Sequence, residues 1–185
     1  MVSYSPTERV GEPKNWTWVL EQPCPECGFD AARIDIARLG DLVRQNAASW
    51  PELLAAPDAT RRPSESRWSA LEYACHVRDV FRVFDERLRL MLEADDPHFA
   101  NWDQGATAID ERYDLQDPAT VADELLAAAA ACAARFDMVT PDDYTRTGNR
   151  SDGSRFTVES FGRYFIHDPI HHLDDVAVGN RLLRS

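Results

Sequence analysis

The chain has 185 residues, of which 32 are acidic and 20 are basic, so its net charge at pH 7 is -12. Nucleic-acid binding requires clustered Lys and Arg that neutralise phosphates, and an acidic chain without a basic run is not expected to provide it. No apolar stretch reaches about 18 residues and no signal peptide is visible, so we expect no membrane span and a cytoplasmic protein.

The first 28 residues are predicted to form an irregular arm, and residues 29–185 a single folded domain. The arm contains four prolines and shows no helical periodicity. Trp16, Trp18 and Leu20 are expected to dock the arm on the domain, because exposed tryptophans are costly.

A C-x-x-C motif, formed by Cys24 and Cys27, lies at the end of this arm. A zinc ribbon would need a second such pair, whereas Cys75 and Cys132 stand alone in helical stripes and are interpreted as small core residues. A thioredoxin-like role would need a βαβ context, which the sequence lacks. We interpret the motif first as a tight turn. A redox-labile pair, or half of a metal site completed by another subunit, are the alternatives.

Four helices are predicted to follow, and together they indicate an all-α, four-helix bundle. The second is the clearest, because Ser69 and Glu72 match a capping box and apolar residues then recur three and four positions apart. Pro169 is expected to kink the fourth helix. The predicted ranges are about 30–50, 69–93, 118–138 and 157–183.

Two connections stand out between these helices. The segment 95–116 is polar and is predicted to be irregular, and long irregular loops in compact domains are often functional. Between the third and fourth helices, residues 151–154 form a turn signal whose flanks predict a short β-hairpin.

Three histidines suggest a metal site. His167 and His171 are four residues apart, which places both on one face of the fourth helix, close enough to share a cation. His76 lies in the apolar stripe of the second helix, where a buried imidazole needs a partner. His172 is rotated by about 100° from His171 and is predicted to lie outside the site. On spacing alone, a hydrogen-bonded core histidine and a chance surface pair fit these residues better than metal ligands do.

The segments around these histidines resemble the DinB-like superfamily. Residues 68–79, WSALEYACHVRD, and residues 164–172, YFIHDPIHH, are similar to its two signature segments, and the resemblance spans roughly residues 30 to 183. It implies an up-down-down-up bundle that holds one divalent metal ion, Zn or Ni by preference, with His76, His167 and His171 as ligands.

The resemblance also implies a class of activity. Members include thiol-dependent isomerases and S-transferases, such as the mycothiol-dependent maleylpyruvate isomerase, so our first hypothesis is an enzyme that uses mycothiol or another low-molecular-weight thiol on a small-molecule substrate. A metal-dependent hydrolase is the alternative, and a non-catalytic metal- or ligand-binding bundle is the third. The sequence does not distinguish a monomer from a homodimer.

Five residues are predicted to surround the metal or the cleft. Asp79 and Asp175 lie within a helical turn of the predicted ligands and are candidates to accept a hydrogen bond from them, although solvated acids on a helix face fit them better. Trp102 is a candidate for the cleft wall, and Arg150 and Arg163 are candidates to bind a substrate carboxylate. No catalytic residue is assigned.

Overall fold

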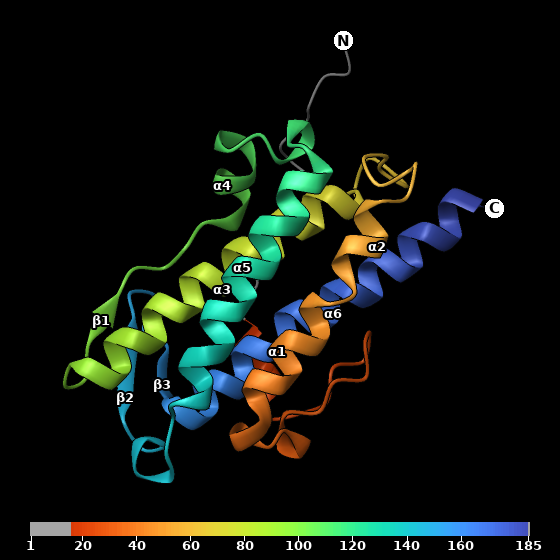
Figure 1. Cartoon of the computed structure of the whole chain (residues 1–185). Coiled ribbons are helices and arrows are strands. Elements are labelled where there is room, and N and C mark those ends of the chain that lie inside the picture. The colour runs from red at the N-terminus through yellow and green to blue at the C-terminus, as the bar shows by residue number, and fades with distance from the viewer. Residues whose placement is uncertain (1–15, 185) are drawn as a thin grey trace.

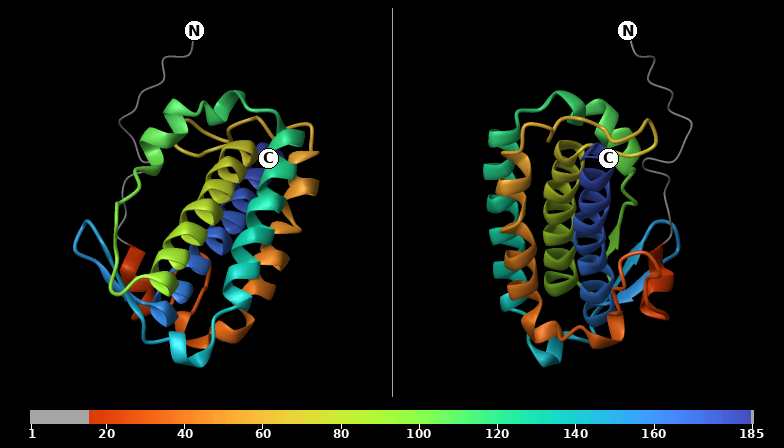
Figure 2. Two further views of the ribbon diagram at one scale, coloured as in Figure 1. Left: turned by 60° about the vertical axis from the view of Figure 1, so that its left-hand side comes forward. Right: turned by 90° about the vertical axis from the view of Figure 1, so that its right-hand side faces the viewer.

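The computed structural model describes residues 16–184, so residues 1–15 of the predicted arm lie outside the described residues. The predicted four-helix bundle is confirmed. Helices α3 and α5 run in the same direction, and α1 and α6 run in the opposite direction, with α1 and α3 each packed between α5 and α6 (Figure 1, Figure 2). The four helices are α1 (Leu39–Ala47), α3 (Ala70–Glu93), α5 (Pro118–Asp137) and α6 (Val158–Arg184).

The predicted helix starts are observed as hydrogen bonds. The Ser69 hydroxyl accepts from the Glu72 backbone N–H, and the Glu72 carboxylate accepts from the Ser69 N–H, which completes the capping box of α3. Asp117 caps α5 by accepting from the Thr120 N–H. These bonds satisfy backbone donors that have no partner inside the helix, so they place both starts at the predicted residues.

The first predicted helix, 30–50, is interrupted. Asp30 and Asp35 accept from backbone N–H groups two residues ahead and begin two short 3₁₀ turns, because such side chains offer the backbone an alternative to a continuous helix. The segment is therefore divided into η2 (Ala31–Arg33), η3 (Ile36–Arg38), α1 and α2 (Trp50–Leu54).

The core consists of the inner faces of the four main helices. Phe165 of α6 stacks on Phe84 of α3 and on Phe136 of α5, with ring centroids 4.9 and 5.3 Å apart. The apolar residues that recur along α3 are all buried, namely Tyr73, Val77, Phe81, Phe84, Leu88 and Met91. Leu182, near the end of α6, is 52% exposed.

The connection 95–116 is more ordered than predicted. It contains β1 (His98–Phe99), α4 (Gln104–Asp110) and η4 (Tyr113–Leu115). The predicted hairpin is present as the antiparallel strands β2 (Thr147–Arg150) and β3 (Arg155–Thr157), and β1 pairs with β2 in parallel. The 3₁₀ turn η5 (Pro141–Asp143) precedes the hairpin.

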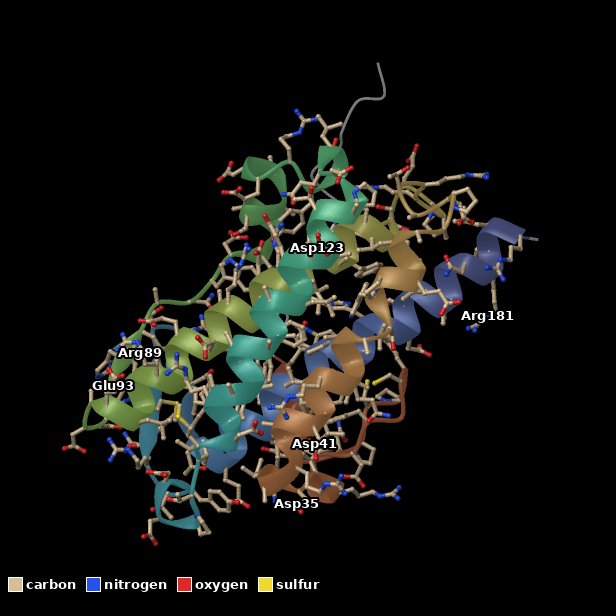
Figure 3. All side chains as sticks on the ribbon, in the orientation of Figure 1. Asp35, Asp41, Arg89, Glu93, Asp123 and Arg181 are labelled. Carbon is tan, nitrogen blue, oxygen red and sulfur yellow. The ribbon has the colours of Figure 1, made fainter. Side chains whose placement is uncertain are left out.

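The arm contributes the 3₁₀ turn η1 (Trp16–Leu20), which packs against α6. Trp18 and Leu20 are partly buried against the core, as predicted. Charged side chains cover the outer faces of the bundle, including Asp41 on α1 and Asp123 on α5 (Figure 3). None of the described helices combines the length and the apolar character that a membrane crossing requires.

Candidate metal centre

Helix α6 carries two clusters of metal-ligating side chains on neighbouring faces. In each cluster, one ligand atom per residue lies within 4.8 Å of all the others. Because an α-helix turns about 100° per residue, residues 167 and 171 point one way, and residues 168 and 172 point to the adjacent side. One cluster contains His76, Asp168 and His172, and the other contains Cys24, Cys27, His167 and His171.

The predicted ligands His76, His167 and His171 are therefore distributed over both clusters, and their joint binding of one ion stays a prediction. His76 faces the Asp168 side of α6, while His167 and His171 face the arm. His172, predicted to lie outside the site, is in the cluster with His76. Spacing along α6 showed that two side chains share a face, but the rotation of α6 within the bundle decides which face meets α3.

The first cluster converges on one carboxylate oxygen. Asp168 Oδ1 lies 3.2 Å from His76 Nε2 and 3.5 Å from His172 Nε2. Ligand atoms bound about 2.0–2.1 Å from a tetrahedral metal ion are themselves about 3.4 Å apart. Two imidazoles and one carboxylate at these separations thus fit a divalent metal ion with small adjustments.

The protonation states also suit a metal site. Burial lowers the pKa of His76, despite the nearby Asp168, so its ring is neutral at pH 7 and retains a lone pair. Burial alone would raise the pKa of Asp168, but His76 and His172 outweigh burial and hold that pKa well below its usual range. The cluster therefore presents the neutral imidazole of His76 and the carboxylate of Asp168.

Neighbouring side chains hold the two rings in place. His172 Nδ1 lies 3.0 Å from Asp175 Oδ2, and the other Asp175 oxygen accepts from Arg67 at 2.7 Å. A carboxylate on the far nitrogen fixes the tautomer and orientation of a metal-binding histidine. The indole of Trp102 stacks on His76, with centroids 5.4 Å apart and planes 3° from parallel.

A cavity of about 80 Å³ opens beside Asp168. A water molecule needs roughly 10–15 Å³ by this measure, so the cavity has room for a small ligand. Trp102, Arg87 and Arg150 are among its lining residues. Arg150 is paired with Asp152 at 2.8 Å and donates to the Tyr164 hydroxyl at 3.0 Å.

Arg87 contributes a buried positive charge to this cavity. Its side chain is buried, donates to the Ala100 carbonyl at 2.8 Å and lies over the rings of Phe84 and Phe99. Burial, with Arg150 nearby, lowers the pKa of Arg87 to about 10, so the guanidinium remains charged at pH 7. Among the described residues it forms no ion pair, which is uncommon for a buried charge.

The remaining predicted residues are placed as follows. Asp175 and Trp102 contact the first cluster, and Arg150 lines the cavity. Asp79 instead accepts from Arg78, Arg82 and the Tyr113 hydroxyl. Arg163 donates to the Ile34 carbonyl and pairs with Glu159, so it anchors the chain after the arm.

Sequence reasoning missed Asp168, His172 and Arg87. A signal for the first two was present, because Asp168 and His172 are also four residues apart and satisfy the same geometric rule as His167 and His171. Arg87 carried no local signal. Its position among the apolar residues of α3 shows that it lies near the core, but only the folded chain shows that it lies in the cavity.

Comparison with known proteins agrees with this architecture. YfiT from Bacillus subtilis, described as a probable metal-dependent hydrolase with an unusual four-helix bundle topology, superposes with a TM-score of 0.64. The match covers 96% of this chain and 94% of YfiT at 16% sequence identity, so it shows the fold alone. A search among proteins of curated function found no match.

The sequence itself matches the family model of the DinB superfamily over residues 39–176. The match begins at the first residue of α1 and ends at Val176, inside α6. It includes every residue of the first cluster. The matched range therefore covers most of the helical bundle together with the His76 cluster. The chain belongs to the DinB superfamily.

Proposed function

We propose that the protein is a divalent-metal-dependent enzyme whose ion is held by His76, Asp168 and His172 and whose substrate is a small anion. The observation that carries the proposal is the convergence of three ligand atoms beside a cavity that contains a buried cation. Three protein ligands that leave a coordination position open are typical of catalytic sites, and two histidines with one carboxylate are a known catalytic set. Zn or Ni suits these nitrogen and oxygen donors.

The chain's own residues have distinct tasks in this proposal. Asp175 holds the ring of His172, and Trp102 restrains the ring of His76. Arg87 binds the negative group of the substrate, because its buried guanidinium lines the cavity and has no carboxylate partner within residues 16–184. A bound divalent ion supplies Lewis acidity, which activates a thiol or a water molecule as the nucleophile.

Thiol transfer is the reaction we favour. The carboxylates that line the cavity are Asp152, which is paired with Arg150, and Asp168, which is assigned to the metal. Among the described lining residues, neither acid is therefore free to act as a general base. A coordinated thiol needs none, because it loses its proton on coordination. In such a reaction the thiolate sulfur would add to an electrophilic carbon–carbon double bond of the substrate. The π bond would break, and its electron pair would take up a proton from solvent, which replaces the proton that the thiol released.

Hydrolysis is the second candidate, and its support is the similarity in fold to YfiT. Metal coordination lowers the pKa of water only to about 7, whereas a coordinated thiol is deprotonated outright, so the lack of a free carboxylate base favours the thiol. A non-catalytic metal- or ligand-binding bundle, the third hypothesis, would bind metal and ligand without turnover.

The test compares metal content and ligand binding in four proteins. We expect His172→Ala to lose one equivalent of metal relative to the wild type, measured by mass spectrometry of the purified chain. His98→Ala is the matched control, because His98 is exposed on β1 and should retain the wild-type content. Retention of the wild-type metal content by His172→Ala would refute the assignment of the ligands.

Thermal shift with mycothiol, glutathione and bacillithiol then distinguishes the reactions. We expect a metal-dependent rise in melting temperature with one thiol, and its loss in Arg87→Met with the metal content unchanged. Absence of any shift with thiols, together with turnover of simple esters or amides, would support hydrolysis instead.

A further inference from the structure

The C-x-x-C motif at the end of the arm forms a turn that gathers its two sulfur atoms. The Gly28 N–H donates to the Cys24 carbonyl at 2.9 Å, and the Cys24 N–H donates to the Phe29 carbonyl at 2.8 Å. Gly28 has a φ of +73°, a conformation that glycine adopts at little cost, so it permits the chain to reverse directly after Cys27. The predicted tight turn is therefore present.

The turn lies against the face of α6 that carries His167 and His171. One ligand atom from each of the four residues lies within 4.8 Å of all the others. Cys24 Sγ is 3.7 Å from His171 Nδ1. A sulfur and a nitrogen bound to one tetrahedral zinc ion, at about 2.3 and 2.0–2.1 Å, are separated by about 3.5 Å. The observed separation thus matches a shared ion.

A buried atom without a partner lies in the same cluster. His167 is 2% exposed, and its Nε2 has no hydrogen-bond partner among the described residues. Buried side-chain nitrogen atoms are nearly always paired, because an unpaired one forfeits its interaction with water. A metal ion held by this imidazole would supply the missing interaction.

From these observations we infer that Cys24, Cys27, His167 and His171 bind a second metal ion, a structural zinc that fastens the N-terminal arm to α6. Two thiolates and two imidazoles in tetrahedral geometry select Zn among the common divalent ions. The four protein ligands leave no open position, unlike the His76 cluster, so this ion has a structural role and takes no part in turnover.

The surroundings are those of a closed metal site. His171 Nε2 faces Glu26 Oε2 at 3.4 Å and Asp175 Oδ2 at 3.6 Å, and such carboxylates typically accept from the far nitrogen of a metal-bound imidazole. The Trp16 ring covers His167 and His171, with centroids 5.1 and 5.0 Å away. Phe29 covers His167 from another direction, also at 5.1 Å.

The ion would also complete the cavity of the first cluster. Trp16 and His167 both line that cavity, together with Asp168. Because Trp16 packs on the rings of His167 and His171, an ion that holds these rings also helps to hold Trp16 in the cavity wall. One alternative from the sequence was that another subunit completes the half site of Cys24 and Cys27. In this inference, His167 and His171 of the same chain complete it.

Cobalt substitution tests the inference on the full-length protein. Protein prepared under reducing conditions is stripped of metal and reloaded with Co²⁺, whose thiolate bonds give an intense near-ultraviolet charge-transfer absorption. We expect this absorption in the wild type and its loss in Cys24→Ala/Cys27→Ala, with one equivalent of metal lost at the same time. Cys132→Ala, which removes a buried thiol of α5, is the matched control and should keep both signals.

A measurement on the wild-type protein covers the case in which the double variant fails to fold. Titration of the thiols of the zinc-loaded protein with an organomercurial should release one zinc ion per chain, detected with a chromogenic chelator. The inference is overturned if the cobalt protein lacks the thiolate absorption, if no zinc is released, or if the folded double variant keeps the wild-type metal content.

The experiments can refute the two proposed metal sites independently of each other. Thiolate absorption that persists in His172→Ala supports the second site whatever happens to the first. If the wild type binds one equivalent and shows the absorption, but His172→Ala changes neither, the proposed function fails while this inference stands.

Discussion

Asp175 lies between the two clusters and contacts one histidine of each. Its Oδ2 lies 3.0 Å from His172 Nδ1 and 3.6 Å from His171 Nε2, and its Oδ1 accepts from Arg67. One carboxylate thus contacts a histidine of each proposed metal site. Both histidines must keep a nitrogen lone pair for the metal, so a partner on the far nitrogen sets the tautomer that binds.

We therefore predict that Asp175→Asn weakens metal binding to the first cluster by about 10–100-fold, the usual effect of removing such a partner. The measurement is a competition titration of the metal against a chromogenic chelator. Asp174→Asn is the control, since it removes the same charge from an exposed neighbouring position. Equal metal affinity in the two variants would contradict the orienting role of Asp175.

At the scale of the elements, a close contact between α1 and α5 fixes one corner of the bundle. Gly40 of α1 lies against α5, where a Cβ atom would come within 2.9 Å of the Ala133 carbonyl oxygen and would overlap the Asp137 carboxylate. The Asp137 side chain can move, but the backbone oxygen of Ala133 cannot move without shifting the helix. The absence of a side chain at position 40 therefore sets the distance between the two helices.

Gly40→Ala separates local propensity from packing. Helix propensity alone predicts a gain of up to about 1 kcal/mol from replacing glycine with alanine inside a helix. We expect the opposite, a loss of about 1–3 kcal/mol in the free energy of unfolding, because the added methyl group forces α1 and α5 apart. Urea denaturation measures the difference.

Gln45→Ala on the exposed face of the same helix serves as the comparison and should change the stability by no more than about 0.5 kcal/mol. A Gly40→Ala protein that is more stable than the wild type would show that the two helices separate at no cost.

For the whole molecule, acid stability depends on carboxylates that are ion-paired only in the folded state. Asp79 is buried, and it accepts from Arg78 at 2.9 Å and from the Tyr113 hydroxyl at 2.6 Å. Burial alone would raise the pKa of Asp79, but these bonds outweigh it, so the folded-state pKa lies below the ordinary value of 3.8. The unfolded chain therefore takes up a proton at this residue before the folded chain does.

The sign of the pH dependence follows. The contribution of Asp79 is fully present above about pH 4 and is lost as the pH falls through its lower folded-state pKa. We expect the free energy of unfolding to fall on acidification below about pH 4, and Asp79→Asn to reduce the slope. Chemical denaturation at a series of pH values measures both.

The control is Asp123→Asn, an exposed position on the outer face of α5 (Figure 3), which should keep the wild-type slope. If Asp79→Asn also keeps that slope, acid unfolding is governed by other carboxylates.

Much of the fold follows from local rules that the sequence displays. The starts of α3 and α5 were predictable because Ser69 with Glu72, and Asp117 with Pro118, satisfy backbone groups within one helical turn. The hairpin of β2 and β3 was predictable because a short turn pairs its own flanks. The division of the first helix was not predictable, because an aspartate can cap either a long helix or a single 3₁₀ turn. Asp30 and Asp35 each cap a short turn.

Helical periodicity is a local property, so the sequence was enough to predict a bundle and to place histidines one turn apart on α6. Which of these histidines meet His76 depends on how far α6 is rotated against α3, and that is known only from the folded chain. The folded chain also brings the two cysteines of the arm to His167 and His171, a contact between segments more than 140 residues apart that no local spacing encodes.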